Sequence, residues 1–175
     1  MNTRSSHFYI FSGLPGVGKT TLAKALSSRL NAVYLRVDTI EKGLIDLCNY
    51  QVEGEGYRLS YRVASDNLEL GNIVVSDSRN PISLTRREWQ EVASSKGIPY
   101  TNIEVICSDA GEHRNRVESR VTDIEGLILP SWQDVVDREY DQWETERVEV
   151  DTASRTPEES VIDLLGKLNI ATQAG

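Results

Sequence analysis

The residues best suited to chemistry in this sequence lie in a glycine-rich run that ends at Lys19 and Thr20. Gly13, Gly18, Lys19 and Thr20 complete the pattern G-x4-G-K-[ST], the Walker A motif. Its glycines let the backbone curl so that N–H groups point at phosphate oxygens, and the helix that follows adds its positive dipole end. An apolar strand precedes the motif and a helical pattern follows it, which favours a phosphate-binding loop over a chance glycine-rich turn.

Each side chain of the loop has an expected role. Lys19 reaches the β- and γ-phosphates of a nucleotide, and the Thr20 hydroxyl is a ligand for magnesium. Thr21 could contact an inner phosphate. The predicted nucleotide-binding residues of the loop are Gly13, Pro15, Gly16, Val17, Gly18, Lys19, Thr20 and Thr21.

Two aspartates directly follow predicted strands. Asp77 ends the hydrophobic run 73–76 and could hold magnesium through water, or could serve only as a turn residue in Asp-Ser-Arg-Asn-Pro. Asp38 follows the run 32–37 and could accept the proton of an attacking hydroxyl, or could merely cap the next helix, since Asp-Thr-Ile-Glu fits a capping box. Ser78 follows Asp77, so the second acid typical of dedicated ATP hydrolases is missing. This favours an attacking oxygen that belongs to a substrate.

Arginines supply the remaining candidate charges. Arg79 could clamp an anionic group of an acceptor or could be a solvated surface residue, and for Arg86 and Arg87 the surface interpretation is favoured. On the helix predicted before residue 120, Arg116 and Arg120 share one side.

A stretch with a glycine and no strong periodicity follows these two arginines, so we predict a lid over residues 114–131. Arginines of a lid neutralise charge on the transferring phosphoryl group and exclude water when the lid closes. The alternative for Arg116 is an ordinary ion pair with a residue one helical turn away, for example Glu112.

The order of elements predicts the architecture. Strands are expected at 8–12, 32–37, 73–76, 102–107 and 148–150. Helices are expected over 19–30, over most of 38–70, after Thr85 with Glu88 as a capping box, from residue 108 or 109 to about 120, from Ser131, and from Thr156 onward. Buried-looking strands separated by helices predict a three-layer α/β/α sandwich around a parallel sheet, with ligands beyond the carboxyl ends of the strands.

A helical insert at 38–71 separates the second and third strands and could cover an acceptor site. The candidate substrate contacts that it carries are Tyr57, Arg58, Tyr61 and Arg62.

Composition restricts the class of protein. The 175 residues suggest a single domain, 1–175, and the net charge of −8 disfavours long nucleic acids and anionic lipid surfaces. No apolar run of 18 residues and no signal-peptide pattern is found. Cys48 and Cys107 lack metal-binding or redox spacing and are interpreted as small buried side chains in a reducing, cytoplasmic setting. The sequence does not indicate the oligomeric state.

Taken together, these motifs resemble those of small P-loop kinases, a group that includes gluconate, shikimate, adenylylsulfate and chloramphenicol kinases, zeta-type toxins and polynucleotide 5′-kinases. The sequence is most similar to predicted kinases of the AAA_33 type. The segments that carry the resemblance are FSGLPGVGKTTLA, RVDTI, VVSDSRNP and EHRNRVESR. The resemblance implies a P-loop NTPase fold with five strands in the order 2-3-1-4-5, a helical lid, and ATP and Mg²⁺ as cofactors. It also implies an adenine site that uses a lid arginine, here Arg116, and the loop after the fifth strand, which contains Thr152.

The leading expectation is an ATP-dependent phosphotransferase that moves the γ-phosphate of ATP-Mg to a hydroxyl of a small-molecule acceptor. The alternatives are a polynucleotide or sugar-nucleotide kinase and a non-catalytic ATP-binding sensor. The expected catalytic residues are Lys19, Asp38, Arg116 and Arg120, the expected metal ligands are Thr20 and Asp77, and the expected substrate contacts are Asp38, Tyr57, Arg58, Tyr61, Arg62 and Arg79. Asp-Ser-Arg-Asn-Pro stands where adenylate kinases have Asp-Gly-Phe-Pro-Arg, and the Asp-x-Asp pattern of shikimate kinases is missing, so no acceptor is named.

Overall fold

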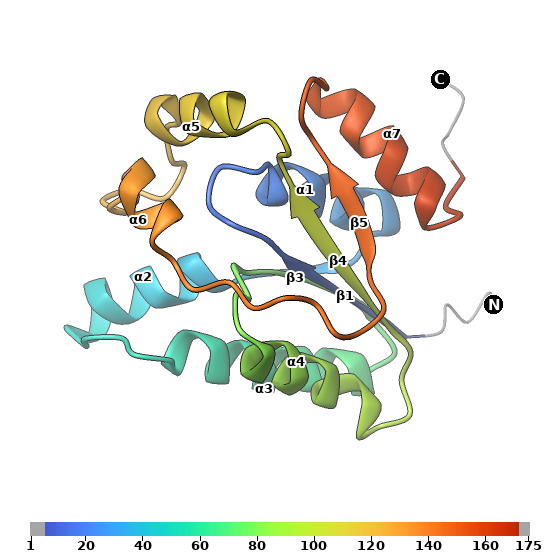
Figure 1. The fold of residues 1–175 in the computed structure, drawn as a ribbon. Helices are drawn as coiled ribbons and strands as arrows, with labels where there is room; N and C mark the ends of the chain where they lie inside the picture. Colours follow the sequence, from blue (N-terminus) through green and yellow to red (C-terminus); the bar gives the residue numbers. More distant parts are fainter. Residues whose placement is uncertain (1–5, 172–175) are drawn as a thin grey trace.

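A five-stranded parallel sheet forms the centre of the computed structural model, which describes residues 6–171 (Figure 1). The strands are β1 (His7–Ser12), β2 (Val33–Arg36), β3 (Ile73–Asp77), β4 (Tyr100–Ile106) and β5 (Val148–Asp151). Their order is β2-β3-β1-β4-β5, which confirms the predicted topology. Because β1 lies between β3 and β4, the loop that follows β1 leaves the sheet where the strand order reverses, the usual place for a ligand in such folds.

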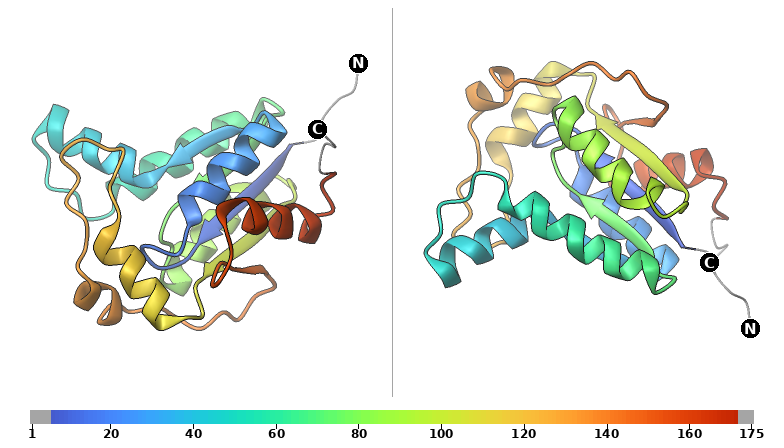
Figure 2. Two further views of the ribbon diagram at one scale, coloured as in Figure 1. Left: turned by 90° about the horizontal axis from the view of Figure 1, so that it is seen from above. Right: turned by 90° about the horizontal axis from the view of Figure 1, so that it is seen from below.

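Helices cover both faces of the sheet and its carboxyl end (Figures 1 and 2). The helices are α1 (Lys19–Leu30), α2 (Val37–Cys48), α3 (Glu55–Glu69), α4 (Ser83–Ser94), α5 (Ala110–Ser119), α6 (Trp132–Val136) and α7 (Pro157–Lys167). One face packs against α1 and α7, and the other packs against α3 and α4. The remaining helices, α2, α5 and α6, lie beyond the carboxyl ends of the strands. In the described part of the chain, no helix is both long enough and apolar enough to span a membrane.

The alternation of side chains along β1 divides the core into two parts. Phe8 and Ile10 pack with Trp89 between the sheet and the α3/α4 layer, whereas Phe11 packs with Leu22 and Leu164 under α1 and α7. Successive strand residues point to opposite faces, so a strand covered on both sides must be apolar throughout. This explains why the strand patterns read as continuous hydrophobic runs.

Local signals at helix ends were predicted with mixed success. Asn31 adopts the left-handed conformation that closes α1, and capping boxes begin α6 at Ser131 and α7 at Thr156. The predicted capping box at Thr85 is wrong, because α4 begins at Ser83 and the Thr85 hydroxyl donates to the carbonyl of Ile82.

The prediction that both cysteines are buried is wrong. Cys48 lies exposed at the end of α2, and Cys107 is only partly buried. Cys48 falls in the last turn of α2, where residues 45–50 are all exposed, so its thiol is not part of the core.

Arg86 is buried, with 3% of its surface exposed, and not a surface residue as predicted. Its Nε donates to the carbonyl of Asn80 at 3.1 Å, and its two terminal nitrogens donate to the carbonyls of Pro81 and Asp141 at 3.0 and 2.9 Å. Its guanidinium carbon also lies 4.1 Å from the centre of the Trp143 ring. A single charge thus joins α4 to the loop after β3 and to the segment that follows α6.

Replacement of Arg86 by methionine should therefore lower the free energy of unfolding by about 2–4 kcal/mol, because several buried carbonyls lose a charged donor. Arg87, the exposed neighbour, provides the matched control, and Arg87→Met should change this free energy by less than about 0.5 kcal/mol. Urea unfolding followed by far-UV circular dichroism measures both. Equal stability of the two variants would show that the buried contacts of Arg86 contribute nothing net.

Candidate active site

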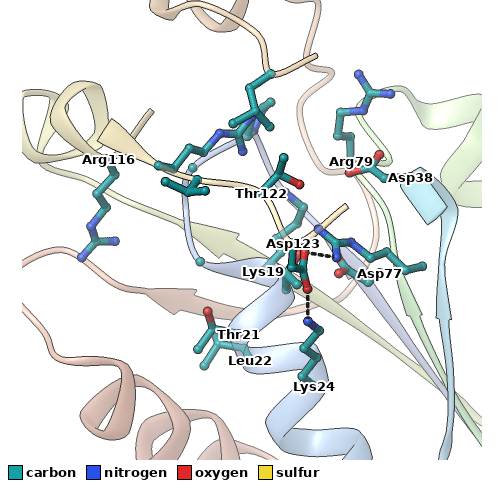
Figure 3. A pocket seen from close by; sticks show the side chains of 18 of the residues that line it. Lys19, Thr21, Leu22, Lys24, Asp38, Asp77, Arg79, Arg116, Thr122 and Asp123 are labelled. Carbon is teal, nitrogen blue, oxygen red and sulfur yellow. Dashed lines mark hydrogen bonds and ion pairs between the residues drawn. The ribbon is translucent and has the colours of Figure 1, made fainter. Parts of the chain in front are cut away.

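A cavity of about 710 Å³ opens at the carboxyl ends of the strands (Figure 3). Seven lysine and arginine side chains line it against four carboxylates, although the whole chain carries a net charge of −8. Twelve of the predicted site residues line this cavity: Pro15, Gly16, Gly18, Lys19, Thr20, Thr21, Asp38, Asp77, Arg79, Arg116, Arg120 and Thr152. The local excess of positive charge suits an anionic ligand.

Two predicted loop residues, Gly13 and Val17, do not line the cavity and instead support the shape of the loop. Gly13 has φ +142°, and a Cβ atom there would lie 2.3 Å from the carbonyl oxygen of Val105. Val17 is buried in the core under α1. The loop therefore needs glycine at position 13 to approach β4 so closely.

Lys19 extends back along the loop, where its Nζ donates to the carbonyl of Leu14 at 2.8 Å. Only 8% of its surface is exposed. Burial lowers the pKa of Lys19 to about 8, although the nearby carboxylates of Asp77 and Asp38 act in the opposite direction. Its charge is thus only partly compensated by the protein.

Asp77 ends β3 between two strands, opposite Phe11 on β1 and Arg36 on β2. Asp77 is 4% exposed, and its carboxylate accepts a hydrogen bond from the Tyr34 hydroxyl at 2.7 Å. Burial, and then the charge of Asp77, raises the pKa of this Tyr34 hydroxyl, which stays protonated and donates. Sequence reasoning missed Tyr34, because its contact depends on the register between β2 and β3.

Asp38 lies in the first turn of α2, which begins one residue earlier at Val37 with Arg36 as its N-cap. No side chain caps this helix, so the capping-box alternative for Asp38 is wrong. The Asp38 side chain makes no hydrogen bond or ion pair with any residue from 6 to 171, and it lies beside Arg79 at one end of the cavity (Figure 3). Glu41, one turn further along α2, also lines the cavity and lies 3.5 Å from Arg79.

Arg116 lies at the opposite end of the cavity from Asp38 (Figure 3). Its guanidinium donates to the hydroxyl and the carbonyl of Thr152 at 2.7 and 2.9 Å and also pairs with Glu112. The Thr152 hydroxyl lies 3.0 Å from the carbonyl oxygen of Val17 in the phosphate loop. The predicted pairing of Arg116 with Glu112 is therefore confirmed, and Arg116 also lines the cavity. Its role toward a transferring phosphoryl group stays a prediction.

The four predicted substrate contacts on α3 are not brought into the cavity. Tyr57 and Tyr61 turn toward the Trp89 side of the core, with ring centres 6.4 and 4.5 Å from that of Trp89. Arg58 and Arg62 are exposed on the outer side of the same helix. The helix packs against the sheet through its tyrosine face, which leaves its arginine face in solvent.

Sequence reasoning also missed several charged residues of the cavity. These are Arg36, Glu41, Lys24, Asp123 and Arg155. Glu41 could have been found, because it lies one helical turn after Asp38. Asp123 could not, since no periodicity fixes the position of the segment that carries it.

Metal binding at this site would need ligands from outside the protein. Among residues 6–171, no group of three or more histidine, cysteine, aspartate or glutamate side chains could hold a metal ion. Thr20 and Asp77 both line the cavity and supply a hydroxyl and a carboxylate, the hard oxygen donors that Mg²⁺ prefers. Two such groups suit an ion that also takes phosphate oxygens and water.

Comparison with known proteins agrees with the fold. A protein from Pyrococcus furiosus named "Putative adenylate kinase" is 30% identical over 165 residues, which cover 90% of this chain and 82% of that protein. Lon protease 1 of Hydrogenovibrio crunogenus is 26% identical over 166 residues, but the chain spans only about 18% of its length. The solved structure of the Mycobacterium tuberculosis adenylylsulfate (APS) kinase, determined with AMPPNP and APS, has a TM-score of 0.69 at 18% identity, covering 95% of this chain and 98% of that one.

The family assignment follows from the matched range. The AAA_33 family, described as an AAA domain, matches residues 9–144, a range that runs from β1 through the phosphate loop and Asp77 to beyond α6. With its kinase-like P-loop fold, the chain belongs to the AAA_33 family.

Proposed function

We propose that this protein is an ATP-dependent phosphotransferase that phosphorylates a hydroxyl of a small-molecule acceptor. The observation that carries the proposal is the unpaired carboxylate of Asp38 in the same cavity as Lys19 of the phosphate loop. The cavity volume of about 710 Å³ falls in the range of small-molecule sites. The net charge of −8 opposes a long nucleic acid as acceptor, and no acid follows Asp77 to activate water.

The transfer needs little covalent chemistry from the protein. The acceptor hydroxyl oxygen forms a bond to the γ-phosphorus, the bond from that phosphorus to the β–γ bridging oxygen breaks, and ADP leaves. The hydroxyl proton passes to a carboxylate oxygen of Asp38. Lys19 and Arg120 stabilise the negative charge on the transferring group. When bound by Thr20 and, through water, by Asp77, Mg²⁺ would neutralise charge on the phosphates.

We assign the nucleotide base to the end of the cavity formed by Arg116 and Thr152. This end is joined to the phosphate loop through Thr152, which lies against Val17, and it is remote from Asp38. A triphosphate that extends from there across Lys19 would bring its γ-phosphate toward Asp38. The arrangement leaves the Asp38 end for the acceptor.

The segment 120–131 acts as the lid in this proposal. It extends from α5 toward α2 (Figure 2, left), and a Cβ atom on Gly126 would lie 3.1 Å from Nζ of Lys42. Asp123 pairs with Lys24 of α1 at 2.5 Å and with Arg36 at the end of β2 at 2.6 Å. These two ion pairs hold the lid across the entrance of the phosphate loop.

Replacement of Asp38 by asparagine should reduce acceptor-dependent ADP formation by about 10²- to 10⁴-fold, because a general base is lost. The affinity for ATP-Mg should change by less than about twofold, since Asp38 lies at the acceptor end. A coupled ADP assay with pooled sugars, amino alcohols, nucleosides and antibiotics finds the acceptor and then compares variants. Asp46→Asn, an exposed position on the same helix, is the control. Unchanged turnover in Asp38→Asn would favour the ATP-sensing alternative.

Nucleotide binding should take up a proton at alkaline pH. Lys19 has a pKa of about 8 in the free protein, so it is about one-quarter charged at pH 8.5. A bound triphosphate raises this pKa toward its ordinary value, which gives an uptake of about 0.7 proton at pH 8.5 and almost none at pH 7. Affinity therefore falls as pH rises from about 8 to 10.

Titration calorimetry in buffers of different ionisation enthalpy measures this uptake directly. Lys19→Met should bind nucleotide more weakly and should show no pH-dependent uptake. Equal proton uptake by Lys19→Met and the wild-type protein would assign the effect to another group.

Replacement of Asp123 by asparagine should loosen the lid. The pairs with Lys24 and Arg36 are partly solvent-exposed and worth at most about 1 kcal/mol together, so amide hydrogen exchange over 120–131 should become about two- to fivefold faster. Glu125→Gln, an exposed change in the same segment, should leave exchange unaltered. Mass spectrometry of the exchanging peptides makes the comparison, and identical rates in both variants would rule out a latch at Asp123.

A further inference from the structure

A second hollow of about 410 Å³ adjoins the acceptor end of the main cavity. The two share Arg79 and the lid residues Ile128, Leu129 and Pro130. Arg138, which follows α6, lines only the second hollow, whereas Lys19 and Asp38 line only the main one. Arg79 therefore lies at the boundary between the reaction centre and this extension.

Arg138 and Arg120 are arginines without hydrogen-bond acceptors. The side chain of neither makes a hydrogen bond or ion pair with any residue in the described range 6–171, and the Nε atom of each is buried. Burial also lowers the pKa of Arg138, and the charge of the facing Arg79 lowers it further. A buried, charged donor without a partner costs free energy that a suitable acceptor would recover.

The carboxylates near these arginines are already used or distant. Asp134 accepts hydrogen bonds from the backbone N–H and the hydroxyl of Ser131, as part of the capping box of α6. Asp137 accepts two from the Gln133 amide at 2.8 Å. They reduce the local charge but supply no acceptor to Arg138.

Glu41 gives Arg79 only a long contact of 3.5 Å. Arg79 and Arg138 thus have N–H groups available to bind an oxyanion. A planar guanidinium can donate two parallel hydrogen bonds, and this geometry fits carboxylate and phosphate groups in particular.

We propose that the phosphoryl acceptor is an anionic hydroxy compound, whose carboxylate or phosphate group is bound by Arg79 and Arg138 while its hydroxyl faces Asp38. This inference rests on the proposed phosphotransferase function and names its substrate class. Arg120, which lines the main cavity with Lys19, is left for the transferring phosphoryl group. The apolar lid residues Leu129 and Pro130 would cover the carbon skeleton between the two ends.

The test compares hydroxy compounds that differ in charge. ADP formation is measured with ribose and ribose 5-phosphate, glycerol and glycerol 3-phosphate, and glucose and gluconate. We expect at least one charged compound to stimulate ADP formation and its neutral partner to stimulate it little. The phosphate pairs and the gluconate pair distinguish a phosphate group from a carboxylate. A neutral compound that stimulates as well as its charged partner would overturn the proposal.

Variants connect the charge preference to the site. Arg138→Gln should raise the KM for the active compound by about ten- to hundredfold with kcat changed less than threefold, and Arg138→Lys should restore part of the loss. Arg62→Gln, an exposed arginine outside both hollows, should have no effect. An unchanged KM in Arg138→Gln would overturn the proposed site.

A binding measurement separates this inference from the proposed function. Inorganic phosphate and acetate are titrated calorimetrically into protein saturated with ADP-Mg, so that the phosphate loop is occupied. Loss of anion binding by tenfold or more in Arg138→Gln, with no compound stimulating ADP formation, would support the anion site and contradict the phosphotransferase. Stimulation that does not depend on acceptor charge, with no anion binding, would support the phosphotransferase and contradict the anion site.

Discussion

The concentration of positive charge at the carboxyl ends of the strands is the constraint on which this site depends. An acidic chain gathers seven cationic side chains around one cavity and compensates them with four carboxylates. Burial lowers the pKa values of Lys19, Arg120 and Arg138, and repulsion from neighbouring arginines lowers them further. An anion in the cavity relieves this repulsion, so ligand binding and the stability of the site are linked.

The fold holds these charges in place through contacts between loops. Asn80 donates to the Ser12 hydroxyl at 2.8 Å, and the backbone N–H of Gly13 donates to the carbonyl of Arg79 at 3.1 Å, so the loops after β1 and β3 are joined directly. His113 of α5 donates to the carbonyl of Pro15 at 2.8 Å. Each strand end is therefore fixed relative to its neighbours before any ligand arrives, which lowers the cost of orienting one.

The parts of the protein that the sequence predicted are those set by local patterns. The G-x4-G-K-T run, the apolar strands and the capping boxes at Ser131 and Thr156 each depend on residues close in sequence, and each is confirmed. The predictions were wrong where contacts between distant parts of the chain determine the position of a side chain or the start of a helix. Arg86 looked like a surface arginine because its carbonyl partners come from residues 80–81 and 141, which no local pattern brings together. The helix begins at Val37, two residues earlier than a capping box at Asp38 would require, so the carboxylate is left free for the cavity.

The proposed acceptor side of the site was the least predictable for the same reason. The α3 tyrosines were candidate substrate contacts because they lie in the helical insert, but they pack against Trp89 instead. Two arginines line the second hollow: Arg79, from a loop, which the sequence did indicate as a candidate, and Arg138, from the chain after a five-residue helix, which it did not. Neither position has a periodicity from which its direction could be read.

In the proposed function, the lid pairs with two of the cations that would attract a ligand. Lys24 and Arg36 line the cavity, yet both are paired with Asp123 of the lid. An anion that draws on these two charges competes with Asp123, and a lid carboxylate that holds them lowers the charge available to the anion. Lid position and anion binding are therefore coupled through shared partners. Such coupling is reciprocal: if anion binding shifts the equilibrium of the lid by a given free energy, the same change in lid position alters the free energy of anion binding by the same amount.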